Sequence, residues 1–379
     1  DTDSGFYKKY RQFSEKMIMG DSKYFVCDFN VDVVLNATYN GDPYPPLISK
    51  DKVEKSMEEN RDKALRELYN KFSADSHEGQ IVTRREIMQH EIKCPPLLCN
   101  DTGNRLFLMA WDSARINDNS IIGVAELIDD PERGWTMHIC NVISLVDVAS
   151  KHKTSLIMPE QVEKFKSILL DYNANEKKKM DYENIKRIVC DAGTGGGMIH
   201  GVSDYLLEEW EGKDGKKHKG IIDKSHKANE VSAKYYPDAL DIMTLVDPQK
   251  ARNELFEAAE QMTKLGVVTF PADCGDKDYI ITIDDEGGEH TYLLTDEERE
   301  ALLQIELMKN EIITMCKYVN AGSVTYNYPP DRRSTMHDDR AFTYGLLCWY
   351  LAKLRRNQVI EKPRLEIDFE FQFRKPRLL

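Results

Sequence analysis

Three consecutive apolar runs constrain the fold of this chain more than any other feature. The runs are RLFLMAWD (105–112), SIIGVAELI (120–128) and TMHICNVISLV (136–146), and polar turns separate them. Each is rich in apolar and β-branched residues, which is typical of strands. Because the connections are short, the three strands are expected to form an antiparallel meander.

A helical pattern at 159–173, a strand at 185–191 and renewed helical periodicity at 196–210 follow the meander. The resulting order, βββαβα, predicts an α/β fold of the ribonuclease H-like type, with a central mixed β-sheet flanked by helices. Later patterns predict strands at 241–247 and 267–270, a helix at 248–266 between them, a hairpin at 278–295 and a long helix at 295–319.

The first hundred residues differ from the rest of the chain. A charged helical segment at 50–72 lies between turn-rich stretches at 36–49 and 93–104. We therefore expect an N-terminal linker or accessory region at 1–100, a core domain at 101–360 and a C-terminal tail at 361–379, whose RLEIDFEFQF alternates like an edge strand. The start at Asp1, without Met, suggests a fragment or a processed product.

Composition limits the environment and the partners. No apolar run approaches the length of a membrane span, and the charged opening DTDSGFYKKYRQ does not resemble a signal peptide, so an intracellular protein without a membrane partner is expected. Eight scattered cysteines without a CxxC pair favour reduced thiols. The net charge of −13 argues against a nucleic-acid partner. A local lysine cluster at 211–227 is either a solvated loop or a patch that contacts a phosphate backbone.

Carboxylates end two of the predicted strands and open a late helix. Asp112 follows the first apolar run, Asp191 ends the strand IKRIVCD, and Asp338 and Asp339 begin a helix after DRRSTMH. Each alone could be an ordinary surface aspartate. Together they predict a centre for hard divalent cations, Mg²⁺ or Mn²⁺, such as a two-metal phosphodiesterase uses.

Helical spacing from Asp338 gives a row of small residues, Ala341, Gly345, Cys348 and Ala352, which would let the helix lie close against the sheet. This spacing favours Asp338 as the ligand, with Asp339 and His337 as alternate or supporting groups. His337 could equally be a hydrogen-bonding residue at the helix start.

The glycine-rich DAGTGGGMIHG (191–201) does not match the phosphate-binding pattern GxxxxGK[ST], which occurs nowhere in the chain, so ATP hydrolysis by this polypeptide is not expected. The glycines instead favour close approach of the backbone to DNA or metal. Asp204, on the following helix, is either structural or a further carboxylate of the site. The hairpin at 279–294 has an acidic tip that would repel DNA, and it is either regulatory or an ordinary surface hairpin.

Three segments resemble the C-terminal nuclease domain of the large terminase subunit of tailed bacteriophages. They are LMAWDSARINDNSIIGV (108–124), IVCDAGTGGGMIHGVSDYL (188–206) and MHDDRAFTYGLLCWYLA (336–352). The resemblance covers about residues 100–357. It places Asp112, Asp191 and Asp338 on the catalytic acidic positions of the family, and Asp118 on a second aspartate before the next strand.

The resemblance implies an endonuclease that cuts concatemeric viral double-stranded DNA during genome packaging, in the cytoplasm of the infected bacterial host. It also implies an upstream ATPase domain, joined through residues 1–100, and portal and small terminase subunits as partners. Two ions are expected when DNA is bound, and a monomer in isolation. DNA contacts are expected from Lys213, Lys216, Lys217, Lys219, Lys224, Lys227 and Arg340.

Two other functions remain open at this stage. The same fold could serve a junction resolvase, which cuts branched DNA. Alternatively, the chain could be a non-catalytic docking module of a packaging motor, which binds its partners through residues 1–100 and the C-terminal tail.

Overall fold

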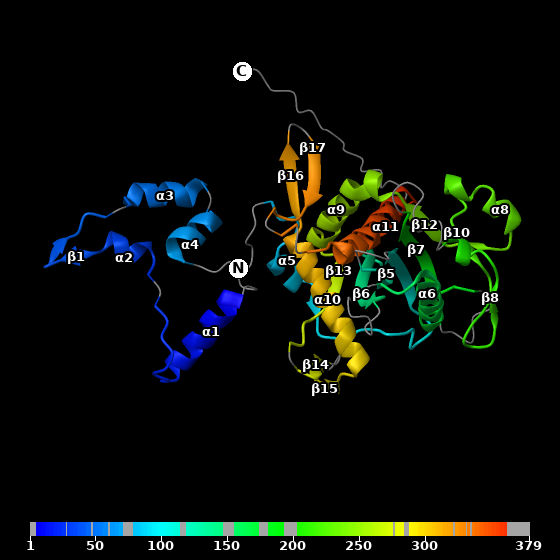
Figure 1. Cartoon of the computed structure of the whole chain (residues 1–379), viewed down its shortest axis with the longest axis horizontal. Helices are drawn as coiled ribbons and strands as arrows, with labels where there is room; N and C mark the ends of the chain where they lie inside the picture. Colours follow the sequence, from blue (N-terminus) through cyan, green and yellow to red (C-terminus); the bar gives the residue numbers. More distant parts are fainter. Residues whose placement is uncertain are drawn as a thin grey trace, which may run out of the picture. The chain divides into compact units, whose positions relative to one another are not determined.

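The computed structural model describes residues 5–27, 29–46, 48–59, 61–70, 79–113, 119–146, 155–173, 181–192, 203–275, 277–283, 288–320, 323–330, 332–333 and 336–361. The chain divides into two compact units. Figure 1 labels the helices and strands along the chain. The smaller unit combines Asp1–Gln89 with Ile312–Met336, and the larger unit combines His90–Glu311 with His337–Leu379. The division thus falls at Gln89–His90, and residues 312–336 group with the N-terminal part.

A seven-stranded mixed sheet forms the centre of the larger unit, in the order β12-β7-β4-β5-β6-β13-β3. Strands β4, β5 and β6 form the predicted antiparallel meander, while β7 and β12 run parallel to β4. Strand β13 is parallel to β6, and the short β3 is parallel to β13. The bounds are β3 Glu91–Ile92, β4 Leu106–Asp112, β5 Ile121–Asp130, β6 Gly134–Ser144, β7 Ile185–Asp191, β12 Met243–Val246 and β13 Val268–Pro271.

This strand order confirms the predicted ribonuclease H-like α/β fold. The sheet has an antiparallel meander whose first strand, β4, is followed on its other side by the parallel strands β7 and β12, which is the arrangement that the βββαβ pattern predicted. Gly134 begins β6 after the tight β5–β6 turn, with a φ of +71° that glycine adopts without strain.

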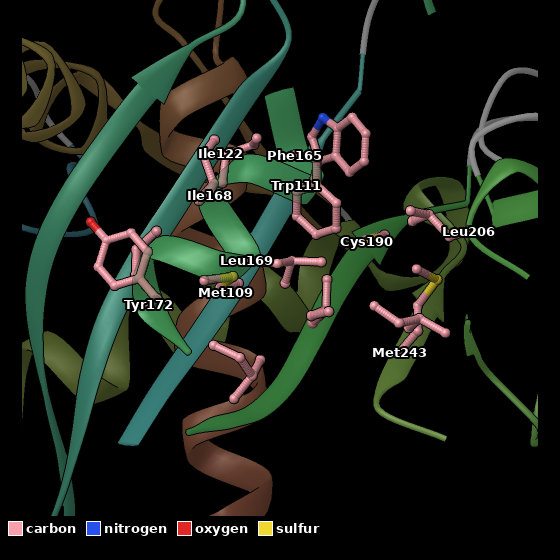
Figure 2. Packing of buried hydrophobic residues seen from close by; sticks show 14 of the residues in the cluster. Met109, Trp111, Ile122, Phe165, Ile168, Leu169, Tyr172, Cys190, Leu206 and Met243 are labelled. Atoms are coloured by element: carbon pink, nitrogen blue, oxygen red, sulfur yellow. The ribbon is translucent and has the colours of Figure 1, made fainter. Parts of the chain in front are cut away.

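Helix α6 (Met158–Tyr172) covers one face of the sheet. Trp111 of β4 stacks on Phe165 of α6 with ring centroids 4.6 Å apart (Figure 2). Phe107 meets Tyr172 edge-on. The cluster also includes Met109, Ile122, Val124, Ile188 and Cys190 from the neighbouring strands. Because side chains alternate along a strand, the intervening residues of β4, β5 and β7 face the opposite side.

Helix α11 (Asp339–Glu361) covers that opposite face, beside α9 (Pro248–Lys264). Gly123 of β5 lets α11 approach closely, since a Cβ there would lie 2.8 Å from Cγ2 of Thr343 and 3.2 Å from Cδ1 of Leu347. Helix α9 begins at Pro248, as predicted. The structure adds Asp247 as its N-cap, and the proline lies in its first turn.

One small residue of the row on α11, Gly345, does not face the sheet as expected. At Gly345 a Cβ would lie 3.2 Å from Cβ of Leu255, so this glycine packs against α9. Thr343 and Leu347 meet the sheet instead. The expectation that the row from Asp338 through Gly345 lies on the sheet is therefore wrong at Gly345, because two neighbouring layers compete for the faces of α11.

An insert lies between β7 and β12 in the sequence. Its described part contains β8 (Trp210–Glu211), β9 (Lys217–His218), β10 (Ile221–Ile222), η1 (Lys227–Asn229), α8 (Ser232–Tyr235) and β11 (Leu240–Asp241). The buried Asp223 ties the insert to β12, because its carboxylate accepts from the backbone N–H groups of Ser225, His226 and Leu245. His218 lies between Asp181 and Asp214 at 3.2 and 3.1 Å, which fixes the β8–β9 turn.

Two predictions concern residues after β13. The expected hairpin is formed by β14 (Tyr279–Ile283) and β15 (Glu289–Leu293), although residues 284–287 of its acidic tip lie outside the described residues. Thr295 and Glu298 form a capping box, in which the side chain of each accepts from the backbone N–H of the other. Helix α10, however, spans only Asp296–Thr314, and β16 (Cys316–Asn320) pairs with β17 (Ser323–Asn327) where the sequence favoured a longer helix.

The smaller unit is mainly helical at its N-terminal end. It contains α1 (Gly5–Ile18), α2 (Val31–Leu35), β1 (Thr38–Tyr39), β2 (Asp42–Pro43), α3 (Lys50–Glu59), α4 (Arg61–Tyr69) and α5 (Arg84–Met88). The single helix predicted for 50–72 is thus two helices. Residues 79–81 join β16, since Lys317 donates to the carbonyl of Gly79 and Ile81 donates to the carbonyl of Met315.

Two general expectations can be compared with the structure. All eight cysteines are free thiols, of which Cys140, Cys190, Cys316 and Cys348 are buried. Among the helices that the structure describes, none combines the length and apolar character needed to cross a membrane.

Candidate metal centre

Asp112 and Asp191 end two neighbouring parallel strands at the same edge of the sheet. Trp111 of β4 pairs with Cys190 of β7, so the two aspartates that follow are adjacent, on strands about 5 Å apart. Trp111 and Cys190 both belong to the core cluster under α6. Asp112 and Asp191 therefore point to the other face, the one that α11 covers.

Asp339, the first residue of α11, reaches the same edge of the sheet. One of its carboxylate oxygens, Oδ2, accepts from the backbone N–H of Asn119 at 2.9 Å and from its side-chain amide at 3.1 Å. Asn119 lies just before β5, whose first residue, Ile121, is opposite Asp112. The side chain of Asp339 is buried, with 6% of the residue exposed.

The position of Asp339 follows from how α11 crosses the sheet. Thr343, one turn further along, donates its hydroxyl to the carbonyl of Asp339 at 2.8 Å and touches Gly123 with its methyl group. Gly123 pairs with Ala110, two residues before Asp112 on the same face. The start of α11 and the end of β4 thus lie on the same side of this contact.

Asp338 is turned toward α9. Its carboxylate forms an ion pair with Arg252, whose guanidinium lies over the ring of Phe256. Its carbonyl accepts from the N–H of Phe342 and so begins the helix. Asp338 is thus held by a cation, whereas Asp339 is held by neutral donors at the sheet edge.

Glu311 of α10 fixes the first turn of α11 from outside the helix. Its Oε2 accepts from the backbone N–H groups of Arg340 and Ala341 at 2.8 and 3.0 Å, and Oε1 accepts from the guanidinium of Arg340 at 2.9 Å. Burial raises the pKa of Glu311 to about 7, against the opposing effects of Arg340 and of the N–H donors.

The remaining candidates lie at varied positions. His337 and Asp204 are exposed, and Asp118 and residues 193–202 of the glycine-rich segment lie outside the described residues. The guanidinium of Arg340 is bonded to Gln304 and Glu311 and its side chain is only 12% exposed, so we assign it to this network instead of to DNA.

The lysine candidates all lie on the insert between β7 and β12. Lys213 is bonded to Asp171 and Ser167, and Lys224 donates to the carbonyl of Pro237. Both are exposed, as are the other four candidates, Lys216, Lys217, Lys219 and Lys227. Lys219 lines a cavity of about 320 Å³ together with three acidic residues, Glu208, Glu209 and Asp238. DNA contact by these lysines stays a prediction.

The donor chemistry of the centre is entirely oxygen. Asp112, Asp191 and Asp339 provide carboxylates, and the buried hydroxyl of Ser113, next to Asp112, has no hydrogen-bond partner within the described ranges. Across those ranges, no three His, Cys, Asp or Glu side chains form a ready-made ligand group. Two carboxylates at one edge nevertheless fit Mg²⁺ or Mn²⁺, because Mg²⁺ usually binds through one or two carboxylates, waters and substrate phosphates.

Sequence reasoning missed Asn119, Arg252 and Glu311. Asn119 and Arg252 carry no distinctive signal, since isolated polar residues are common. Glu311 carries one, because it lies between Met308 and Ile312 on the buried face of an amphipathic helix. A charged residue on such a face requires partners inside the protein.

No family model matches this chain, and no curated protein matches it. Among solved structures, the large terminase nuclease from the thermophilic phage G20c with bound magnesium is 12% identical, with 72% of this chain and 97% of that chain covered and a TM-score of 0.39. The nuclease domain of the large terminase subunit of bacterial virus Sf6, with manganese, is 10% identical, covers 71% and 98%, and has a TM-score of 0.34.

The Holliday junction resolvase of yeast mitochondria is also similar, at 11% identity, with 73% of this chain and 89% of that chain covered and a TM-score of 0.28.

Proposed function

We propose that this chain is a divalent-metal-dependent DNA endonuclease that hydrolyses phosphodiester bonds. One observation carries the proposal. Asp112 and Asp191 end adjacent parallel strands on the face covered by α11, and the buried Asp339 at the start of α11 is bonded to Asn119 beside them. Two carboxylates at neighbouring strand ends, with a third at the start of a helix at the same edge of the sheet, are donors of the type that metal-dependent phosphodiester hydrolysis uses.

Asp112 and Asp191 would hold Mg²⁺ or Mn²⁺, with Asp339 as the third carboxylate and Asp338 as its alternate. When bound, such ions activate water and neutralise charge on the phosphate, and two of them are expected in the presence of DNA. The protein contributes position: Asn119 orients Asp339, and Glu311 holds the helix turn that carries it. Local cations at the carboxylates would also offset the net charge of −13 where DNA approaches.

The biological role that we propose is the cutting of concatemeric viral DNA during genome packaging, in the cytoplasm of an infected bacterium. Support comes from the three segments 108–124, 188–206 and 336–352, which contain Asp112, Asp191 and Asp338 and occur in the order of the terminase nuclease pattern. The proposed partners are double-stranded DNA, an ATPase domain of the same subunit, the portal and the small terminase subunit. We propose a monomer in isolation.

The test is plasmid cleavage by the purified chain with Mg²⁺, Mn²⁺ or a chelator. The variants are Asp112→Asn, Asp191→Asn and Asp339→Asn, and the matched control is Asp129→Asn, an exposed residue at the far end of β5. We expect metal-dependent cleavage that the control retains and that the Asp112 and Asp191 variants lose by at least about a thousandfold, as residues acting on the reacting atoms do. Asp339→Asn should also impair it.

Two outcomes would redirect the proposal. Preferential cutting of four-way junctions over linear DNA would favour a resolvase. Absence of cleavage from a folded protein, both alone and with an ATPase partner supplied, would favour a non-catalytic docking module.

A further inference from the structure

The first turn of helix α11 is bonded to a side chain that comes from another helix. The first N–H groups of a helix have no acceptor within that helix. Here the N–H groups of Arg340 and Ala341 donate to one oxygen of Glu311, which comes from α10. A carboxylate at this end also interacts favourably with the helix dipole.

The second oxygen of Glu311 and the amide oxygen of Gln304 hold the guanidinium of Arg340. Two side chains of α10 thus bind one residue of α11. Glu311 binds both the backbone and the guanidinium of Arg340, and Gln304 binds the guanidinium. Asp338 and Asp339 directly precede that residue, so the network fixes the turn on which both carboxylates stand.

Glu311 also occupies a special place along the chain. The chain leaves the larger unit after Glu311 and returns to it at His337. Residues 312–336, which lie between these points in the sequence, belong to the smaller unit. The bonds from Glu311 to Arg340 and Ala341 therefore join the two ends of this excursion within the larger unit. Displacement of either end would act first on the turn that carries Asp338 and Asp339.

We propose that Glu311 positions the carboxylates of Asp338 and Asp339. It does this by capping α11 from α10, at the point where the chain leaves the larger unit for residues 312–336. Its effect on cleavage rests on the proposed function, whereas its effect on the first turn of α11 does not. In this view the candidate site includes Glu311, a residue that would touch neither metal nor DNA, as well as the carboxylates that would face the metal.

The experiment compares Glu311→Ala and Glu311→Gln with the control Glu297→Ala, an exposed glutamate near the start of the same helix. Amide hydrogen exchange is followed on the full chain for residues 339–343 and, separately, for 346–358 of α11. Mn²⁺ affinity is measured by calorimetry, and cleavage rates are measured over a range of Mn²⁺ concentrations.

For Glu311→Ala we expect roughly tenfold faster exchange confined to the first turn, the loss typical of a removed cap. Weaker Mn²⁺ binding should accompany it, and the cleavage rate should recover partly at high Mn²⁺. Glu311→Gln keeps an acceptor oxygen and should lie between alanine and wild type. Glu297→Ala should match wild type.

Unchanged exchange in the first turn of Glu311→Ala would overturn the proposal. So would exchange raised equally throughout α11 with unaltered Mn²⁺ affinity, because that is the result of a general loss of stability. If the wild-type protein neither binds Mn²⁺ nor cuts DNA, the proposed function fails while exchange still decides the cap. If wild type and Glu311→Ala cut and bind Mn²⁺ equally, the positioning role fails and the nuclease stands.

Discussion

A single methyl group added at Gly123 should disturb both the stability of the core and the candidate metal centre. A Cβ at this position would lie 2.8 Å from Cγ2 of Thr343 and 3.2 Å from Cδ1 of Leu347. Since carbon atoms pack best at about 3.5–4.0 Å, the first contact is too short by roughly 0.7 Å. Overpacking of this kind costs about 1–3 kcal/mol. The lower flexibility of alanine in the unfolded chain offsets about 0.5–1 kcal/mol of it.

A second substitution isolates the cause. Thr343→Ser removes the methyl group that overlaps but keeps the hydroxyl that donates to the carbonyl of Asp339. Alone, it should cost about 1 kcal/mol, the value of one buried methyl group. Combined with Gly123→Ala it should cost less than the sum of the two, by about 1 kcal/mol, because the overlap with Thr343 is gone.

The assay is urea unfolding of wild type, both single variants and the double variant, with plasmid cleavage run on the same samples. We expect Gly123→Ala to reduce cleavage by more than its loss of stability explains, because α11 must move away from the sheet and carry Asp339 with it. Additive free energies, within about 0.3–0.5 kcal/mol, would refute the close approach of Thr343 to Gly123.

Three other predictions concern buried polar groups. Burial lowers the pKa of His138 from 6.5 to about 4, so the unfolded chain binds a proton at this imidazole at a higher pH than the folded chain does. The free energy of unfolding should therefore fall by up to about 3 kcal/mol between pH 6.5 and 4. In urea unfolding at several pH values, His138→Gln should reduce this pH dependence. Lys309 is fully buried and its ammonium contacts Glu91 and Glu306, so Lys309→Met should cost about 3–5 kcal/mol in guanidinium unfolding, and a loss below about 1 kcal/mol would contradict the network. Asp223→Asn puts an amide donor among N–H donors and should cost about 2 kcal/mol. Proteolysis within 203–241 should then accelerate, and an unaltered digestion pattern would count against the tether.

The sheet was largely predictable because its strands are local apolar runs with short connections. Asp112 and Asp191 were predicted for the same reason, because a carboxylate at the end of a buried strand must lie at the edge of the sheet. These are properties of short segments, which a sequence records directly. The mixed order β12-β7-β4-β5-β6 then follows from the ribonuclease H-like pattern.

The choice between Asp338 and Asp339 could not be made from helical spacing. Periodicity shows which residues of α11 share a face, but not whether that face meets the sheet or α9. Two contacts determine the orientation of α11: Gly345 lies against Leu255 of α9, and Thr343 lies against Gly123 of β5. The residues of each pair are far apart in the sequence.

The end of α10 was missed for a related reason. Residues 316–319 continue an apolar pattern that suits a helix, but Cys316 bridges to Gln80 and pairs with Asn327. Partners this distant along the chain override local helix propensity. Glu311 was overlooked because its role depends on Arg340, 29 residues away in the sequence.

The position of α11 at the end of the described chain has a consequence for the order of synthesis. The strands that end in Asp112 and Asp191 leave the ribosome long before residues 339–361, which cover their face of the sheet and supply Asp339. Until then, the apolar residues on this face remain open to solvent, and the third carboxylate does not yet exist. A chain with the function proposed above would therefore stay inactive near the nucleic acids of its own translation machinery until α11 had folded.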